Sequence, residues 1–277
     1  MRQNNTPKPV VEGTNPLSAA ISSRDSDVVS MVRTAVEHRW VRLAYQMVVS
    51  AAAPDRPVYF ESLIRVLDNT GRIIPARDFM PVIEDNELGR QLDVLALENA
   101  LDILGQHPRM RLSVNMSARS AGYYPWKEAL LNGLKRDGTI AERLILEVAE
   151  KDTYTIPELV QSLMEELHLL GVSFALDNFG QGLTSLRHLR DLYFDIIKID
   201  GIFTRELAGN PDNQAMTGAI LALSHSLETY VIAQNVETAE DANALIQLGV
   251  DGMQGYYFGA PTLEPAWLEE GVSCRIA

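Results

Sequence analysis

The stretch from Phe174 to Asp200 reads FALDNFGQGLTSLRHLRDLYFDIIKID and points to the fold of the chain. One apolar run in it ends in Asp177-Asn178-Phe179-Gly180, and a second ends in Lys198-Ile199-Asp200. A parallel α/β sheet presents its functional side chains just past the carboxyl ends of its strands. We therefore expect acid, amide and ammonium groups to meet at one rim of such a sheet.

The same alternation of short apolar runs and helical spacing continues on both sides of this stretch. Strands are predicted at 41–49, 58–67, 112–115, 144–148, 173–176, 196–199, 230–233 and 252–257, the first two as a hairpin. Helices are predicted at 27–38, 75–104, 126–135, 157–170, 183–192, 213–228 and 239–248. The pattern favours an α/β fold, a TIM-like (β/α)8 barrel with one antiparallel strand near its start. An open doubly wound sheet is the alternative.

Length and composition indicate one globular domain with an extension. The chain has 277 residues, and (β/α) barrels typically take about 250 as a single unit. Residues 1–26 are rich in Pro, Asn, Ser and Thr and lack hydrophobic periodicity. We expect them to form a flexible extension or linker, and residues 27–277 to form the barrel domain.

Charge and cysteine content restrict the partners and the compartment. The formal net charge is −13, which argues against binding a DNA or RNA polymer but allows a small phosphate ligand held by a few cations. Cys274 is the single cysteine, so a disulfide framework is excluded within the chain and a reducing cytoplasm is the expected location. No apolar run reaches about 18 residues, so no membrane span is expected.

Polar side chains follow successive predicted strands. They are Glu61, Asn115, Glu147, Asp177 with Asn178, Lys198, Gln234 with Glu237, and Gln254. Carboxylate and amide oxygens suit hard cations such as Mg²⁺ or Mn²⁺, and no His or Cys is present among them to favour zinc or copper. Each residue alone is more often a turn former or a helix cap. Such residues at successive strand ends predict a shared site.

From Tyr45 to Pro261 the chain resembles the EAL family of bacterial cyclic-di-GMP phosphodiesterases. The matching segments are Glu61-Ser62-Leu63-Ile64-Arg65 (ExLxR), Asn115-Met116-Ser117 (NxS), Glu147-Val148-Ala149-Glu150 (ExTE), Asp177-Asn178-Phe179-Gly180 (DDFG), Lys198-Ile199-Asp200 (KxD) and Gln254-Gly255-Tyr256-Tyr257-Phe258 (QGYxF). Their order and spacing together are specific, although each motif alone is weak.

The resemblance implies a role for each matching residue. The first metal ion would be held by Glu61, Asn115, Glu147 and Asp177. Lys198 would orient water or stabilise charge with support from Asp200, Glu150 would steady a neighbouring loop, and Glu237 is a further catalytic candidate. Arg65 would contact a ligand phosphate, and Gln46, Asp200 and Gln254 complete the implied ligand-binding set.

Two departures fall on the implied ligands of a second metal ion. Asn178 replaces the second aspartate of DDFG, and Gln234 replaces the glutamate of AEGVET, in which Asn235 also replaces the glycine. Lesser changes are Met47 for the proline of YQP, Ser62 for alanine, Ala149 for threonine and Gln181 for threonine. An amide offers a dipole where a metal pair needs full negative charge. We therefore expect at most one fully occupied Mg²⁺ or Mn²⁺ ion.

Three functions remain open from the sequence. The favoured one is a cyclic-di-GMP receptor or regulatory module with weak or absent phosphodiesterase activity. The alternative is a working phosphodiesterase that produces linear pGpG, with Asn178 and Gln234 as weaker ligands or Glu237 as a substitute. The third is a structural, partner-binding domain without nucleotide. A homodimer and a regulatory protein partner are further expected associations.

Overall fold

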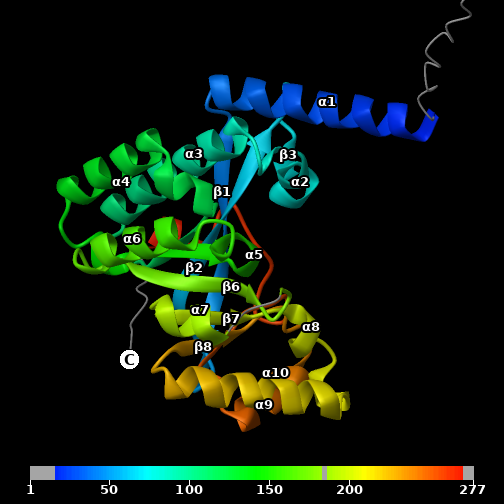
Figure 1. Cartoon of the computed structure of the whole chain (residues 1–277), viewed down its shortest axis with the longest axis vertical. Coiled ribbons are helices and arrows are strands. Elements are labelled where there is room, and N and C mark those ends of the chain that lie inside the picture. The colour runs from blue at the N-terminus through cyan, green and yellow to red at the C-terminus, as the bar shows by residue number, and fades with distance from the viewer. Residues whose placement is uncertain (1–15, 183–185, 271–277) are drawn as a thin grey trace, which may run out of the picture.

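The structure, a computed structural model, describes residues 16–182 and 186–270. Figure 1 shows a central group of strands surrounded by helices, with one long helix across an end of the molecule. The prediction of a flexible extension falls partly on residues 1–15, which lie outside the described residues. The other masked residues are 183–185 and 271–277.

Within the described residues, eight strands close into a mixed barrel. Their order is β1-β9-β8-β7-β6-β5-β4-β2, and β2 pairs with β1 to complete the circle. β1 is antiparallel to both neighbours, whereas the other barrel pairs are parallel. The strands are β1 (Val41–Ser50), β2 (Ala53–Leu67), β4 (Leu112–Met116), β5 (Leu144–Ala149), β6 (Ser173–Phe179), β7 (Ile196–Ile199), β8 (Tyr230–Ala233) and β9 (Gly252–Met253). The predicted barrel is confirmed, and the open sheet is wrong.

Helices cover the outside of the barrel and bury its outward apolar side chains. The longer ones after the first hairpin are α3 (Glu87–Gln106), α4 (Tyr124–Arg136), α6 (Pro157–His168), α7 (Leu186–Asp191), α9 (Pro211–Ser226), α10 (Ala239–Leu248) and α11 (Ala266–Glu270). Short elements are α2 (Met80–Ile83), α5 (Glu150–Thr153), α8 (Gly201–Thr204), η1 (Ala76–Asp78), η2 (Ala118–Gly122), η3 (Ala141–Arg143) and η4 (Leu207–Gly209). Among the described residues, no helix is both long and apolar enough to cross a membrane.

The first helix, α1 (Pro16–Glu37), begins earlier than the sequence predicts. Its second half packs Val32 and Ala35 against Phe79 and Ile83 in a small core beside the barrel. Residues 20–24 are exposed, so they carry no buried stripe that periodicity could detect. Residues 16–26 are therefore helical rather than irregular, while the domain boundary at residue 27 stays a prediction.

The single helix predicted for residues 75–104 is wrong. Pro75 ends an edge strand, β3 (Ile73–Pro75), which pairs with β2, and α3 begins only after Asn86. The side chain of Asn86 accepts a hydrogen bond from the Leu88 amide at 2.9 Å and caps the new helix. The apolar residues before and after Asn86 have the spacing of one continuous helix. The Asn86 cap is the sequence signal that separates the two segments.

The last predicted strand, at 252–257, is also too long. β9 ends at Met253, and the chain then turns toward the loop after β8. The Tyr257 amide donates to the Val236 carbonyl at 3.1 Å, and a Cβ on Gly255 would lie 2.0 Å from that same carbonyl oxygen. Glycine is required here because the two backbones touch, and this contact ends the strand.

Asp93 on α3 anchors the turn that follows β4. It is buried, and one of its carboxylate oxygens accepts hydrogen bonds from the Ser117 amide at 2.9 Å and the Ser120 hydroxyl at 2.6 Å. Burial raises the pKa of Asp93 to about 6, against a partial lowering by these hydrogen bonds. The folded state therefore binds a proton more tightly than the unfolded chain.

This raised pKa predicts a pH-dependent stability. The contribution of Asp93 is fully present below the unfolded pKa of 3.8 and is lost as the pH rises through about 6. The free energy of unfolding should fall by up to about 3 kcal/mol over that window from this group alone. Urea titrations of the native chain and of Asp93→Asn between pH 4 and pH 7.5 measure it. The stability of the native chain relative to that of Asp93→Asn should fall as pH rises, and parallel curves would contradict the assignment.

Candidate functional site

The polar side chains of the site occupy the inward positions of the barrel strands near their carboxyl ends. On five strands, the residue two positions before the polar side chain also points inward and is apolar. These apolar side chains form the floor of the site. The pairs are Tyr59 and Glu61, Ile145 and Glu147, Ala175 and Asp177, Ile196 and Lys198, and Ile232 and Gln234. Because alternate residues of a strand point to the same side, each of these strands contributes one side chain to the apolar floor and one to the polar layer above it.

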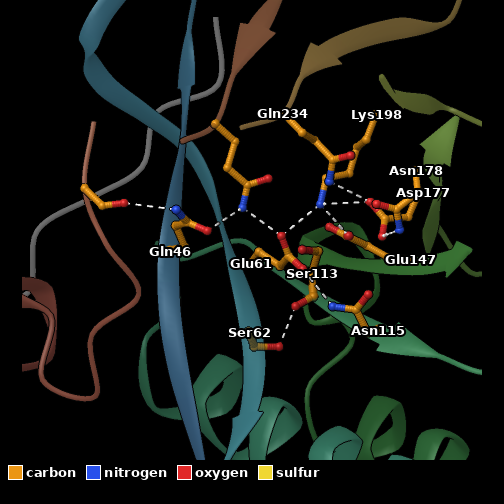
Figure 2. A network of polar contacts seen from close by, with 12 residues as sticks. Gln46, Glu61, Ser62, Ser113, Asn115, Glu147, Asp177, Asn178, Lys198 and Gln234 are labelled. Atoms are coloured by element: carbon orange, nitrogen blue, oxygen red, sulfur yellow. Dashed lines mark hydrogen bonds and ion pairs between the residues drawn. The ribbon is translucent and has the colours of Figure 1, made fainter. Parts of the chain in front are cut away.

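Lys198 lies among three buried carboxylates. Its ammonium donates to Glu61 at 2.9 Å and to Glu147 at 2.6 Å, and it lies 3.5 Å from a carboxylate oxygen of Asp177 (Figure 2). The Lys198 side chain has no exposed surface. One positive charge therefore balances three acidic groups from three other strands.

Burial and mutual repulsion separate the pKa values of these acids. Burial, followed by the charge of Glu61, raises the pKa of Glu147 to about 8. Burial also raises the pKa of Asp177. For Glu61, burial is outweighed by the attraction of Lys198 and by hydrogen bonds from Lys198, Gln254 and Asn115, so its pKa is lowered. The cluster binds protons readily, which is the behaviour of a site with excess negative charge.

Carboxamides complete the Glu61 side of the cluster. Asn115 donates to one oxygen of Glu61 at 2.8 Å, and Gln254 donates to the other at 2.7 Å. The Gln254 amide also lies 3.2 Å from the Gln46 side-chain oxygen, and Gln46 donates to the Gly259 carbonyl at 3.0 Å. This chain of hydrogen bonds, visible in Figure 2, joins β1, β2, β4 and the segment after β9.

Asn178 and Gln234 both donate to Asp177. The Asn178 amide reaches one carboxylate oxygen at 2.6 Å, and the Gln234 amide reaches the other at 2.8 Å (Figure 2). Asn178 adopts a left-handed backbone with φ of 57°, a conformation that asparagine tolerates better than most residues. Both oxygens of Asp177 are thus occupied by neutral donors from the two positions at which the family carries acids.

Glu150 holds the segment that follows β6. One of its carboxylate oxygens accepts from the Gly180 amide at 2.9 Å and from the Gly182 amide at 2.8 Å. A Cβ on Gly182 would lie 3.2 Å from the Glu150 carboxylate, and Gly180 has a φ of 94°. These two hydrogen bonds hold the backbone of residues 180–182, and the loop-steadying role of Glu150 stays a prediction.

Two of the predicted site residues lie outside the inner cluster. Asp200 caps α8 by accepting from the Ile202 amide at 2.8 Å, and it lines a neighbouring hollow rather than the cleft above the cluster. Glu237 is exposed at the rim, with a carboxylate oxygen 3.8 Å from Arg205. Neither contacts Lys198 among the hydrogen bonds and ion pairs of the described residues.

A cleft of about 500 Å³ opens above the cluster. Its floor includes Gln46, Glu61, Gln234 and Gln254, and its rim carries the predicted Arg65. The rim also carries Arg77, Arg205, Asn235 and Tyr256. Arg77 and Arg205 were missed because one falls in a segment predicted as helix and the other follows no motif. Tyr256 belongs to the segment that resembles QGYxF, and its side chain is exposed.

The sequence model of the EAL domain matches residues 29–261. The chain belongs to the EAL domain family. It is 28% identical over 238 residues to the cyclic di-GMP phosphodiesterase PdeF of Escherichia coli, covering 84% of this chain and 32% of that protein. It is 32% identical over 236 residues to the bifunctional diguanylate cyclase/cyclic di-GMP phosphodiesterase MucR of Pseudomonas aeruginosa, covering 83% and 34%. The chain thus spans about a third of the length of these relatives.

Solved EAL domains have the same fold. The EAL domain of FimX from Pseudomonas aeruginosa bound to c-di-GMP superposes with a TM-score of 0.79 at 27% identity, covering 86% of this chain and 97% of that one. The MucR phosphodiesterase in complex with c-di-GMP gives a TM-score of 0.74 at 30% identity, covering 85% and 97%. The relatives therefore include proteins named as phosphodiesterases, and both of these solved EAL domains are complexes with c-di-GMP.

The acid cluster offers oxygen donors rather than a preformed metal site. No group of three or more His, Cys, Asp or Glu side chains in the described residues forms a ready metal site. Instead, oxygens of Glu61, Glu147 and Asp177 converge on the Lys198 ammonium. Carboxylate oxygens are the ligands that Mg²⁺ and Mn²⁺ prefer, so an ion here would replace or share the contacts of Lys198.

The central role of Lys198 predicts a large loss of stability on its removal. Lys198→Met leaves three buried acids without their cation, and the free energy of unfolding at pH 7 in EDTA should fall by about 3–5 kcal/mol. Lys151→Met is the matched control, because Lys151 forms an exposed pair with Glu84 at 2.9 Å and should cost under about 1 kcal/mol. Urea unfolding of the three proteins gives both values. Equal losses in the two variants would show that the cluster does not depend on its ammonium.

Proposed function

We propose that this EAL domain is a cyclic-di-GMP receptor with weak or absent phosphodiesterase activity. The observation that carries the proposal is the pair of amide donors on Asp177, from Asn178 and Gln234. Acids at these two positions would put three carboxylates together and demand a cation. The amides satisfy Asp177 without one, and they remove two negative charges from the place where a second ion would bind.

The loss of a second ion acts on hydrolysis more than on binding. EAL phosphodiesterases are metal-dependent, generally with Mg²⁺ or Mn²⁺. When a metal pair is bound, it activates water and stabilises both the attacking and the leaving oxygen. In this chain, Glu61, Asn115, Glu147 and Asp177 would hold one ion at most, while Asn178 and Gln234 are weakened ligands. Without the pair, water stays largely protonated at neutral pH and the nucleophile is scarce.

The cleft keeps the means to bind an anionic dinucleotide. Arg65, Arg77 and Arg205 line it, and guanidinium groups match phosphate oxygens in geometry and charge. Burial and the neighbouring Arg77 lower the pKa of Arg65, so an anion placed between the two is stabilised. Tyr256 adds an exposed aromatic face on which a base could stack. The cleft volume of about 500 Å³ lies within the range of small-molecule sites.

Two assays on the purified domain test this function. Cyclic-di-GMP at 100 times its dissociation constant should stabilise the fold by about 2.7 kcal/mol through mass action, measured as a rise in melting temperature. Chromatography after incubation with Mn²⁺ should detect little or no pGpG. Turnover equal to that of an intact family member would favour the phosphodiesterase alternative. No thermal shift at any metal concentration would favour a structural domain without nucleotide.

Restoring the two acids should restore hydrolysis. Because both positions serve one cation, Asn178→Asp with Gln234→Glu should raise the rate of pGpG formation in Mn²⁺ at least about tenfold above either single change. Asn132→Asp, on the outside of α4, is the control for added charge and should leave the rate unchanged. Full recovery by one single substitution would contradict the shared-cation argument.

A further inference from the structure

Among the buried polar atoms without a hydrogen-bond partner on the described protein, three come from neighbouring strands in the acid cluster and the layer below it. They are the Tyr59 hydroxyl, the Ser113 hydroxyl and Oε1 of Glu147. All three side chains are at most 1% exposed. An unsatisfied polar group at such depth costs about 1–3 kcal/mol, so three together need an explanation.

The three atoms come from adjacent strands. β4, which carries Ser113, lies between β2 and β5, which carry Tyr59 and Glu147. Ser113 is paired with Glu61 on β2 and with Ile145 on β5. Tyr59 lies two residues before Glu61, and Glu147 lies two residues after Ile145. Tyr59 and Ile145 share the apolar floor of the barrel, and Ser113 is the strand partner of Glu61 (Figure 2). The three orphan atoms therefore come from three neighbouring strands and from the floor of the barrel and the layer above it.

Their chemistry is complementary. Tyr59 and Ser113 each offer a hydroxyl that donates and accepts, whereas Glu147 Oε1 only accepts when ionised. The other oxygen of Glu147, Oε2, already accepts from Lys198 at 2.6 Å. A single water needs two to four polar partners, and these three groups supply them: the water accepts from Tyr59 and donates to Ser113 and, when Glu147 is ionised, to its Oε1.

We propose that a buried water links Tyr59, Ser113 and Glu147, and that Tyr59 is a positioning residue for the Glu147 carboxylate. Fixing Oε1 from below turns Oε2 toward the centre of the cluster, where it meets Lys198 or a divalent ion. The ion part of this inference rests on the proposed role of Glu147 as a metal ligand. The water itself does not.

Calorimetry with Mn²⁺ alone tests the positioning role. Partners that orient a ligand typically change metal affinity by 10- to 100-fold. Tyr59→Phe and Ser113→Ala should each weaken Mn²⁺ binding about tenfold or more, and the double variant should be no weaker than the worse single one because both act through one water. Tyr230→Phe is the matched control. It also removes a tyrosine hydroxyl, which is partly buried and donates to the Asp251 carbonyl at 2.8 Å, away from the cluster. Unchanged Mn²⁺ affinity in Tyr59→Phe would overturn the positioning role.

Unfolding measurements in EDTA separate this inference from the proposed function. If the native protein binds no Mn²⁺, the metal site fails, but the water is still tested by the stabilities of Tyr59→Phe, Ser113→Ala and the double variant. A shared water predicts that the two losses are clearly non-additive. Additive losses would mean that the two hydroxyls are independent, and the proposed link would be wrong.

Discussion

The site depends on one buried ammonium surrounded by three acids. Lys198 comes from β7, and its partners Glu61, Glu147 and Asp177 come from β2, β5 and β6. Such charges are tolerated inside a protein only when they are paired and hydrogen-bonded. The barrel meets that condition because alternate residues on every strand point inward, so that one polar layer is assembled above an apolar floor.

The amides around this core decide what the cluster can do. Two of the three acids accept from neutral donors: Glu61 from Asn115 and Gln254, and Asp177 from Asn178 and Gln234. These hydrogen bonds take up lone pairs that an ion would otherwise use, and they carry no charge. The cleft presents three arginines to an anion. Below them, amides at positions 178 and 234 leave less negative charge to hold a pair of cations than acids there would. Recognition of a phosphodiester thus draws on the arginines of the cleft, whereas its cleavage by a metal pair draws on the negative charge below them.

Much of this arrangement could be predicted from the sequence, because parallel strands bring their carboxyl ends to one rim. The residues of the inner cluster were identified in this way, and the substitutions at Asn178 and Gln234 were visible by comparison with the family pattern. The orientation of these two side-chain amides could not be predicted, because the surrounding groups determine whether the nitrogen or the oxygen of an amide faces a given neighbour. Arg77 and Arg205 were missed because Arg77 falls in a segment whose apolar spacing predicted one long helix, and Arg205 belongs to no motif. The capping role of Asp200 depends on where α8 begins, which the sequence pattern did not resolve.

The number of ions that accompany an intact dinucleotide tests the central claim most directly. Crystals of the domain grown with cyclic-di-GMP and Mn²⁺, measured at the manganese absorption edge, locate each ion by its anomalous signal. We expect at most one peak, bounded by Glu61, Glu147 and Asp177, with the phosphodiester uncut. Two fully occupied peaks, with the second coordinated by the side-chain oxygens of Asn178 and Gln234, would contradict it.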